Sequence, residues 1–275
     1  MNLKITLAAV FAQALVFTSM PIYAENLSTI LKGEHRSEEN KARDQFRHPQ
    51  KVLEFFNVEP DDHVLEMWPG SGWYSEILAP YVKEKGVFSA ATFATDNLNS
   101  EDKRDAFWSK IANKYREKMS DSDLYGDVHF SVFQNSKFEG NDLPAQVDVI
   151  LIVRTLHVWD EMGQMQESLK NLFKILKPGG VLGIVQHRAN SISDFASTAG
   201  EGYMDQRYVV NAAEQAGFKL TATSEINQNL RDTKDYPKGV YALPPMLAMG
   251  KLNKKKYLSI GESDRMTLKF VKPNS

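Results

Sequence analysis

A glycine turn behind an acidic residue is the part of this sequence that points most directly to chemistry. Glu66 lies near the end of the apolar run 63–67, and Gly70 and Gly72 follow it closely. Glycines let the backbone approach a ligand, and the acid can accept hydrogen bonds from an amine or from backbone amides. A nucleotide-binding loop of this kind usually has a third glycine, and Trp68 occupies that place. The pattern predicts a ligand-binding turn that Trp68 has altered.

Histidines and arginines follow two later strand-like runs. Arg154 and His157 come after one of them, and His187 and Arg188 come after the next. Because the carboxyl ends of parallel strands meet at one edge of a sheet, we expect these side chains near the glycine turn. Histidine has the pKa range of a general base, so His157 and His187 are catalytic candidates, with a purely structural role as the alternative. Arg154 and Arg188 are candidates for binding an anionic or hydroxylated substrate.

Other catalytic and metal-binding patterns are missing from the sequence. The chain has no cysteine, which excludes disulfides, thiol chemistry and thiolate metal sites. The six histidines show neither His-x3-His nor His-Glu-x2-His spacing, so no metal site is predicted. The elbow of serine hydrolases and the phosphate-binding loop of ATPases are absent as well. A net charge of −2 argues against a nucleic-acid partner, which would require a basic surface.

Residues 1–24 differ in composition from the rest and predict a secretory signal peptide. Lys4 precedes the mostly apolar run 5–17, and Ala24 ends a short segment with small residues ahead of Glu25. An uncleaved membrane anchor is the alternative, but the run is shorter than the roughly 20 residues that span a bilayer. We therefore expect a periplasmic or secreted protein that keeps no stable membrane anchor after cleavage.

The elements that must position the candidate residues alternate along residues 25–275, which we expect to form one domain. Its composition, with 42% apolar and 25% charged residues in the whole chain, is typical of a folded soluble protein. Strand-like runs lie at 63–67, 87–92, 128–133, 147–153, 181–186, 218–226 and 264–271, and helical patterns include 101–119, 162–176 and 205–217. This alternation predicts an α/β fold with a mostly parallel sheet and right-handed crossovers.

Three further segments lie outside this alternation. Residues 25–58 predict an N-terminal helical cap, because proline at position 49 suits the first turn of a helix. The insertion 228–263 is long for a connection in a compact domain, and such insertions either shape a substrate site or are mobile. The Ser/Gly-rich segment 189–203 is a second candidate lid, which makes Tyr203 a candidate for substrate binding.

Several motifs resemble those of class I S-adenosylmethionine-dependent methyltransferases in order and spacing, over roughly residues 44–271. They are Val64-Leu-Glu66, Pro69-Gly-Ser-Gly72, Val147-Asp-Val-Ile-Leu151 and Leu176-Lys-Pro-Gly-Gly-Val-Leu182. An exported, poorly characterised branch is the closer resemblance, on the motifs Ala42-Arg-Asp44, Arg47-His-Pro49, Trp68-Pro-Gly-Ser-Gly-Trp-Tyr74 and Arg154-Thr-Leu-His-Val-Trp159. The resemblance implies a Rossmann-like, seven-stranded, mostly parallel sheet whose last strand is antiparallel, with helices on both faces.

The resemblance also implies S-adenosylmethionine as the cofactor and indicates where it would lie. Glu66, Gly70 and Gly72 would form the floor under its amino-acid and ribose end. Thr92 stands where the family usually has an acid for the ribose hydroxyls, and Asn135 lies near the place of the adenine-side acid. The aromatic residues of the turn, Trp68 and Trp73 among them, could face the sulfonium cation, although packing against the N-terminal helices is the alternative for each.

The function expected from these observations is methyl transfer to a small, oxygen-bearing acceptor. The run from Arg154 to His157 lacks the Asn/Asp-Pro-Pro-aromatic sequence of the amine-methylating nucleic-acid enzymes in that family. A small-molecule substrate is therefore expected, and the sequence leaves the oligomeric state open. The alternative is a non-catalytic exported binding protein that reuses a degenerate methyltransferase pocket, which the changes at Trp68 and Thr92 favour.

Overall fold

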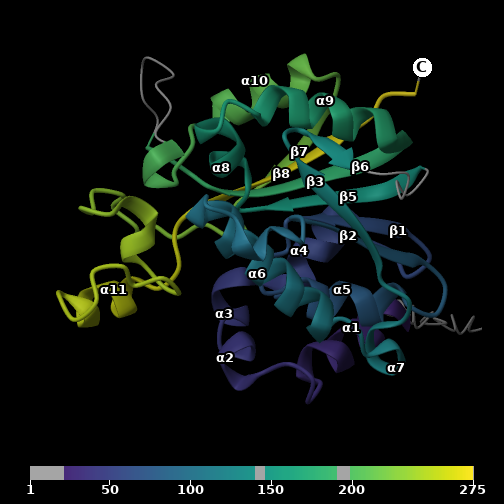
Figure 1. The fold of residues 1–275 in the computed structure, drawn as a ribbon, viewed down its shortest axis with the longest axis horizontal. Coiled ribbons are helices and arrows are strands. Elements are labelled where there is room, and N and C mark those ends of the chain that lie inside the picture. Colours follow the sequence, from purple (N-terminus) through teal and green to yellow (C-terminus); the bar gives the residue numbers. More distant parts are fainter. Residues whose placement is uncertain (1–21, 140–145, 191–198, 275) are drawn as a thin grey trace, which may run out of the picture.

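An eight-stranded sheet with helices on both faces forms the body of the protein in the computed structural model, which describes residues 22–139, 146–190 and 199–274 (Figure 1). The order across the sheet is β4-β3-β2-β1-β5-β6-β8-β7. In chain order the strands are β1 (His63–Met67), β2 (Val87–Thr92), β3 (His129–Gln134), β4 (Lys137–Glu139), β5 (Val147–Val153), β6 (Leu176–His187), β7 (Lys219–Ser224) and β8 (Arg265–Val271).

Parallel pairing dominates the sheet, as the sequence predicts. β3, β2, β1, β5 and β6 run parallel to one another, whereas β8 lies antiparallel between β6 and β7. The expected Rossmann-like α/β fold with an antiparallel last strand is therefore confirmed. The strand count differs from the expected seven, because β4 folds back on β3 as a hairpin. Its turn consists of Asn135 and Ser136, which both have positive φ. Neither is a glycine, so the sequence lacks the usual signal for such a turn.

The register of the parallel strands brings the ends of β1, β2 and β5 to one edge of the sheet. Glu66 is paired with Ala90 of β2 on one side and with Leu151 of β5 on the other. The turn after β1, the end of β2 at Thr92 and the residue after β5, Arg154, therefore lie close together. Ligands bind at this edge in open α/β sheets.

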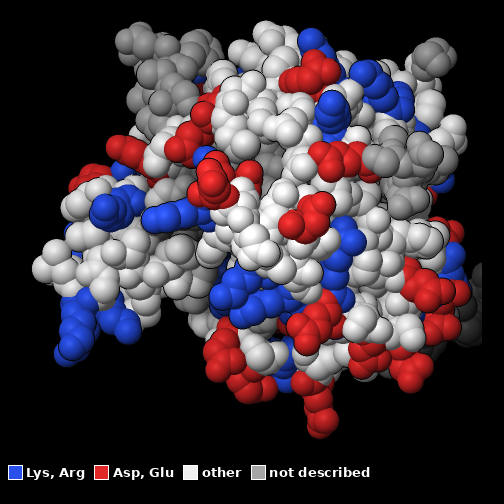
Figure 2. Space-filling model, viewed as in Figure 1, with Lys and Arg blue, Asp and Glu red and all other residues white. Residues whose placement is uncertain are grey.

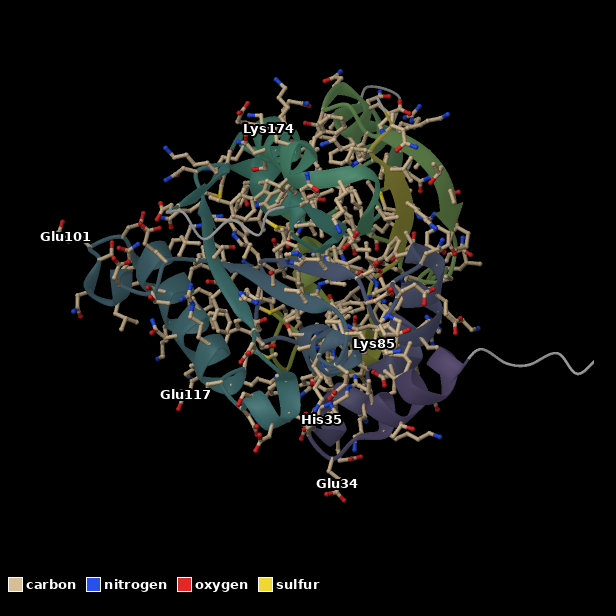
Figure 3. The ribbon with its side chains drawn as sticks, turned by 90° about the vertical axis from the view of Figure 1, so that its right-hand side faces the viewer. Glu34, His35, Lys85, Glu101, Glu117 and Lys174 are labelled. Atoms are coloured by element: carbon tan, nitrogen blue, oxygen red, sulfur yellow. The ribbon has the colours of Figure 1, made fainter. Side chains whose placement is uncertain are left out.

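Helices cover both faces of the sheet. One face packs against α8 (Leu156–Glu161), α9 (Met165–Ile175) and α10 (Gln206–Gln215). The other packs against α1 (Ile22–Lys32), α4 (Pro49–Phe56), α5 (Ser75–Val82), α6 (Lys103–Lys118) and α7 (Ser122–Tyr125). Figure 3 shows the two layers from the side, with Lys174 of α9 on one side of the sheet and Glu117 of α6 on the other.

Two helical segments differ in detail from the sequence patterns. Within the predicted cap, residues 38–47 form two short helices, α2 (Glu38–Lys41) and α3 (Asp44–Arg47), and Ser37 caps the first of them. The helix predicted at 162–176 is α9, which ends at Ile175, and β6 begins at the next residue, Leu176. The last residues of α9 thus pass straight into the strand without an intervening loop.

The predicted cap over 25–58 is confirmed as helical, since α1 to α4 fill most of it. Pro49 occupies the first turn of α4, and Val52, Leu53 and Phe56 bury the face that meets the sheet. Residues 1–21 of the predicted signal peptide lie outside the described residues, so that assignment stays a prediction. Over the described parts of the chain, no helix has the length and apolar character needed to cross a membrane.

The insertion 228–263 has a small apolar core of its own. It contains the 3-10 turn η3 (Gly239–Ala242) and α11 (Lys254–Ile260), whose Tyr257 packs edge-on against Tyr236. Figure 1 shows this segment projecting to one side of the sheet. Its Pro245 and Met246 reach the ligand-binding edge described below.

Candidate functional site

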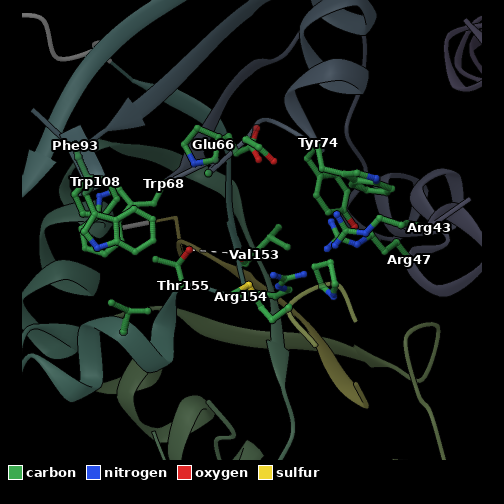
Figure 4. A pocket seen from close by; sticks show the side chains of 17 residues that line it. Arg43, Arg47, Glu66, Trp68, Tyr74, Phe93, Trp108, Val153, Arg154 and Thr155 are labelled. Carbon is green, nitrogen blue, oxygen red and sulfur yellow. Dashed lines mark hydrogen bonds between the residues drawn. The ribbon is translucent and has the colours of Figure 1, made fainter. Parts of the chain in front are cut away.

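A cavity of about 300 Å³ lies at the expected edge of the sheet (Figure 4). The glycine turn after β1, the segment after β5, α3 and the insertion each contribute part of its lining. Its size is at the lower end of the range for small-molecule sites. Aromatic rings gather at one end in Figure 4 and guanidinium groups at the other, so the two ends differ in chemistry.

The glycine turn leaves open space at the cavity floor. Gly70 has a φ of 61° and lines the cavity, and a Cβ at this position would meet no atom within 4 Å. Gly72 has a φ of 79°, and a Cβ there would lie 2.8 Å from the ring of Tyr115. Gly70 is thus free for close approach of a ligand, whereas Gly72 is needed for the packing of α6 on the turn.

Glu66 is the acidic residue of the cavity lining, and its side chain belongs to a short chain of hydrogen bonds. Ser75 donates to its Oε2 at 2.6 Å, and the hydroxyl of Tyr115 donates to Ser75 at 2.9 Å. Burial raises the pKa of Glu66 to about 7, and the bond from Ser75 opposes this rise only in part. A cationic amine bound beside this carboxyl would favour its ionised form.

The indole of Trp68 does not fill the space over Gly70. It packs on Phe93 with 4.1 Å between ring centroids, and its Nε1 donates a 2.8 Å hydrogen bond to the carbonyl oxygen of Phe133. Phe93 in turn stacks on Trp108 of α6 at 4.6 Å with an 11° angle between the rings. These three rings, which we call the aromatic wall, close one end of the cavity.

A second cavity, of about 130 Å³, lies beyond the aromatic wall. Trp68, Phe93 and Trp108 line both cavities, and the second one also has Gln134 and Asn135 from the hairpin turn after β3. The predicted cofactor residues are thus divided between two spaces. Glu66 and Gly70 face the first, whereas Asn135 faces the second.

Thr92 lies at the end of β2, at the position where the methyltransferase family usually has an acid that binds the ribose hydroxyls. Its hydroxyl is buried and donates to backbone carbonyl oxygens of Phe93 or Ser131, while Arg116 of α6 donates to it at 3.1 Å. Thr92 therefore already has partners within the protein. It lines only a narrow crevice of about 10 Å³ behind the turn.

Three arginines form the opposite end of the cavity, which we call the arginine corner: Arg43, Arg47 and Arg154. Behind them lies Glu262, whose side chain is 3% exposed. Its carboxylate accepts from Nε of Arg43 at 2.7 Å and from Nε of Arg47 at 3.0 and 3.1 Å. Nη1 of Arg265 also donates to it, at 3.0 Å. Arg154 lies further from the carboxylate, with its Nη1 4.0 Å from Oε2.

The charges of this end shift several pKa values. The arginines hold the pKa of Glu262 at about 2 against the opposing effect of burial. Burial and the neighbouring guanidinium groups lower the pKa of Arg154 to about 10, and they also lower that of Arg47. Four guanidinium groups thus share one carboxylate, which leaves positive charge in excess.

Trp73 and Tyr74 line the cavity beside the arginine corner. The guanidinium of Arg47 lies over the ring of Trp73, 4.5 Å from its centroid, and the indole Nε1 donates to the carbonyl oxygen of Asn40 at 3.0 Å. This ring was predicted to face a cofactor cation, and one of its faces meets a cation of the chain itself. Burial raises the pKa of Tyr74 to about 12, so its hydroxyl is a donor at neutral pH.

His157 and His187 lie next to each other, with ring centroids 5.6 Å apart, but neither is part of the cavity lining. Gln186 bonds to Nδ1 of His157 at 3.1 Å, and Ser263 bonds to Nδ1 of His187 at 2.5 Å. Burial lowers the pKa of both rings, to about 4 for His157. Each ring therefore has a partner in the protein, and the catalytic role predicted for them stays a prediction.

The remaining predicted substrate residues divide in the same way. Arg154 lines the cavity, whereas Arg188 is held by Glu225 at 2.6 and 2.8 Å and by Asp264 at 3.0 and 3.1 Å. Tyr203 is buried and donates its hydroxyl to Asp232. Neither Arg188 nor Tyr203 is among the residues that line the cavity.

Sequence reasoning missed Arg47 as a cavity residue, because Asp44, three residues earlier, has the spacing of an ion-pair partner on a helix. Asp44 instead pairs with Arg36 at 2.7 Å, and Arg47 turns to Glu262, more than two hundred residues further along the chain. The repeat of arginine at positions 43 and 47, one helical turn apart, was the available signal. Nothing local to Glu262 identifies it as their partner.

A metal centre finds no support among the residues that the structure describes. No three or more histidine, aspartate or glutamate side chains gather there in an arrangement that could hold an ion. Acidic and basic side chains are interspersed on the face that Figure 2 shows.

Comparison with known proteins identifies the fold. No protein-family model matches the chain, and no curated protein matches it either. Among solved structures, a SAM dependent methyltransferase from Aquifex aeolicus is 22% identical with a TM-score of 0.52, over 68% of this chain and 87% of its own. The [4+2]-cyclase SpnF is 15% identical with a TM-score of 0.58, over 89% of this chain and 86% of its own.

A third similar structure is the glycopeptide N-methyltransferase MtfA in complex with S-adenosylhomocysteine. It is 12% identical with a TM-score of 0.50, over 82% of this chain and 87% of its own. The chain therefore has the Rossmann-like fold of S-adenosylmethionine-dependent methyltransferases. One of the three neighbours is described as a cyclase, so the fold by itself does not determine the reaction.

Proposed function

We propose that this protein binds S-adenosylmethionine at the glycine turn and transfers its methyl group to a small, oxygen-bearing acceptor. The observation that carries the proposal is the open space over Gly70 with the carboxyl of Glu66 in the same cavity. A carboxylate beside an unobstructed glycine backbone fits the amino-acid end of the cofactor, whose amine is a cation. The shared fold with methyltransferases supports this reading.

When bound, the cofactor supplies an electrophilic methyl group, and the chain has to align the acceptor with it and exclude water. Glu66 would hold the amine, and Pro245 and Met246 of the insertion would cover the cavity. Trp73 and Tyr74 offer an apolar surface for the acceptor. Removal of a proton from the acceptor would fall to His157 in α8 or to His187 at the end of β6, both of which lie outside the cavity lining.

The nucleoside end of the cofactor fits the second cavity, where Gln134 and Asn135 offer amide donors and acceptors. The aromatic wall stands between the two cavities, so one ligand can occupy both only if the wall opens. Trp108 comes from α6 and not from the glycine turn, and displacing it would leave the turn in place. Binding of the whole cofactor is therefore expected to be coupled to a movement of this ring.

The proposal is tested by calorimetric titration of the purified protein with S-adenosylmethionine and S-adenosylhomocysteine. We expect a measurable heat of binding and a rise in melting temperature with ligand concentration. Glu66→Ala should weaken both, while Glu225→Ala, at an exposed acid outside the cavity lining, should leave them unchanged. If neither ligand stabilises the wild-type protein at millimolar concentration, the proposal is wrong.

A non-catalytic binding protein is the second candidate, and the closed aromatic wall together with the occupied hydroxyl of Thr92 favours it. The two functions differ in turnover. Release of S-adenosylhomocysteine in the presence of an acceptor supports the enzyme, whereas tight cofactor binding without any release supports the binding protein.

We further propose that the protein is exported and belongs to an exported branch of methyltransferase-like proteins. The support is the run 5–17 followed by Ala24 and Glu25. Cleavage after Ala24 would leave a periplasmic or secreted protein. N-terminal sequencing of the protein from the exporting cell tests this, and a retained Met1 or a cytosolic location would contradict it.

A further inference from the structure

The arginine corner contains a guanidinium group that the protein places in the cavity without using it. Arg154 follows β5 with a φ of 60°, and its backbone N–H donates to the carbonyl oxygen of Val185 at 2.7 Å. Such a left-handed conformation is costly for a residue with a side chain and is often found at functional sites. Within the described residues, no hydrogen bond holds its guanidinium, which keeps only the 4.0 Å contact with Glu262.

Arg43 and Arg47 direct their remaining donors to the same space. Both use Nε to bind Glu262, and both line the cavity. Figure 4 shows their side chains and that of Arg154 at one end of the cavity, with Tyr74 beside them. These residues come from α3 and from the end of β5, so the tertiary fold alone brings them together.

The charge of this end is not balanced by the protein. Glu262 is a single carboxylate facing four guanidinium groups, those of Arg43, Arg47, Arg154 and Arg265. Arg154 is partly buried, and burial, together with repulsion from Arg265 and Arg43, lowers its pKa to about 10. Buried positive charge of this kind is stabilised by an anion that accepts hydrogen bonds from it.

The rest of the cavity indicates what surrounds the anionic group. Trp73 and Tyr74 line the cavity next to the arginines, and the aromatic wall closes its far end. Glu66 faces the middle of the cavity from β1. A flat or apolar body would therefore lie against the rings, while its anionic oxygens lie at the arginines.

We propose that the arginine corner binds a carboxylate or phosphate group of the acceptor, so that the substrates are small anionic molecules with an aromatic or apolar body. Arg154 is the residue whose donors are free for this group, and Arg43 and Arg47 supply additional donors. The role as acceptor site rests on the proposed methyl transfer. The binding of an anion there does not.

The test compares 4-hydroxybenzoate with its neutral analogue 4-hydroxybenzamide by calorimetry, in the presence of saturating S-adenosylhomocysteine. We expect the carboxylate to bind at least about tenfold more tightly, as a charge-assisted pair with arginine should provide. Phenyl phosphate is titrated in parallel, and the tighter of the two anions identifies the group that fits. Equal affinities for the acid and the amide would overturn the proposal without any variant being needed.

Matched variants locate the anion. Arg154→Gln should abolish most of the preference for 4-hydroxybenzoate over 4-hydroxybenzamide. Among the described residues, the guanidinium otherwise loses only its 4.0 Å contact with Glu262. Arg231→Gln removes the same charge from an exposed arginine outside the cavity lining and should leave the preference intact. Equal losses in the two variants would mean a general effect of charge, and would overturn the assignment.

Titrations of 4-hydroxybenzoate with and without S-adenosylhomocysteine separate this proposal from the proposed function. If 4-hydroxybenzoate and S-adenosylhomocysteine compete, the arginine corner holds the carboxylate of the cofactor and the acceptor proposal is wrong. If the cofactor does not bind but 4-hydroxybenzoate does, with dependence on Arg154, methyl transfer is refuted and the anion site stands. If both bind together, both proposals are supported.

Discussion

The indole of Trp68 donates a 2.8 Å hydrogen bond to the carbonyl oxygen of Phe133, and this bond ties the turn after β1 to the end of β3. Because β2 lies between β1 and β3, the ring spans the edge of the sheet at which a nucleotide would lie. It thereby builds the aromatic wall that separates the two cavities. Trp68 also holds a φ of 44°, which is unfavourable for a residue with a bulky side chain.

Replacing Trp68 by glycine should join the two cavities and tighten cofactor binding. One ring contact of the aromatic wall, that of Trp68 on Phe93, no longer has to be opened. It is worth about 0.5–1.5 kcal/mol, so we expect affinity for S-adenosylhomocysteine to rise by about twofold to tenfold. Stability should fall by about 2–4 kcal/mol, because loss of a buried ring outweighs relief of the positive φ. Calorimetry and urea unfolding measure the two effects.

The control for that change is Trp68→Phe, which keeps an aromatic ring in the wall but loses the bond to Phe133. It should cost about 1 kcal/mol of stability and leave the affinity unchanged. Equal affinities in the wild type, the glycine variant and the phenylalanine variant would show that the wall does not obstruct the cofactor.

Glu66→Gln should stabilise the protein, and more so as the pH rises. The pKa of Glu66 is raised from 4.5 to about 7, so the wild type loses stability relative to the variant as pH rises from about 4.5 to about 7. The difference amounts to about 3 kcal/mol when the shift is fully expressed. Chemical unfolding of both proteins at pH 4.5, 6 and 8 measures it, and a difference that does not change with pH would refute the shift.

His157→Gln should make the protein less sensitive to acid. Burial lowers the pKa of His157 from 6.5 to about 4. Between these two pH values the ring is protonated in the unfolded chain but not in the folded protein, so the wild type loses stability as the pH falls from about 6.5 to about 4. As the pH falls through this range, the melting temperature of the wild type should therefore fall more than that of the variant, so that the two values converge or cross. His129→Gln, at an exposed histidine, controls for the substitution itself.

The same variant tests the catalytic role predicted for His157. A turnover assay at pH 7 with the variant still folded should show a loss of about a hundredfold or more if the ring acts as a base. A folded variant with unchanged turnover would restrict His157 to its hydrogen bond with Gln186.

Glu262→Gln should destabilise the protein by about 3–5 kcal/mol, because it leaves the surrounding arginines as buried charges without a partner. The pKa of Glu262 is lowered to about 2, so its contribution is present above pH 4.5 and is lost as the pH falls toward 2. Urea unfolding at pH 7 and pH 3 measures both effects. Glu225→Gln removes an exposed carboxylate from Arg188 and should cost no more than about 1 kcal/mol.

The strands along the chain and the class of the fold were predictable from sequence because they depend on local patterns. Runs such as 147–153 are apolar throughout, which is typical of a parallel strand covered on both faces. The glycines at 70 and 72 identified the turn, and their positive φ values agree with that prediction. The sequence did not predict the hairpin strand β4, because Asn135 and Ser136 form its turn and neither is a glycine.

What only the tertiary structure decided is which of the candidate side chains meet. His157, His187 and Arg188 lie at or shortly after the ends of their strands, as predicted, but none of them lines the cavity. Ser263 instead bonds to His187, and Asp264 bonds to Arg188. Arg47 and Glu262 were not predicted as partners, because a carboxylate can balance a guanidinium at any separation along the chain. Sequence thus determined the fold and the glycine turn at the edge of the sheet, since backbone geometry follows local residue types. The charge and shape of the cavity depend on contacts between distant segments, which local patterns do not specify.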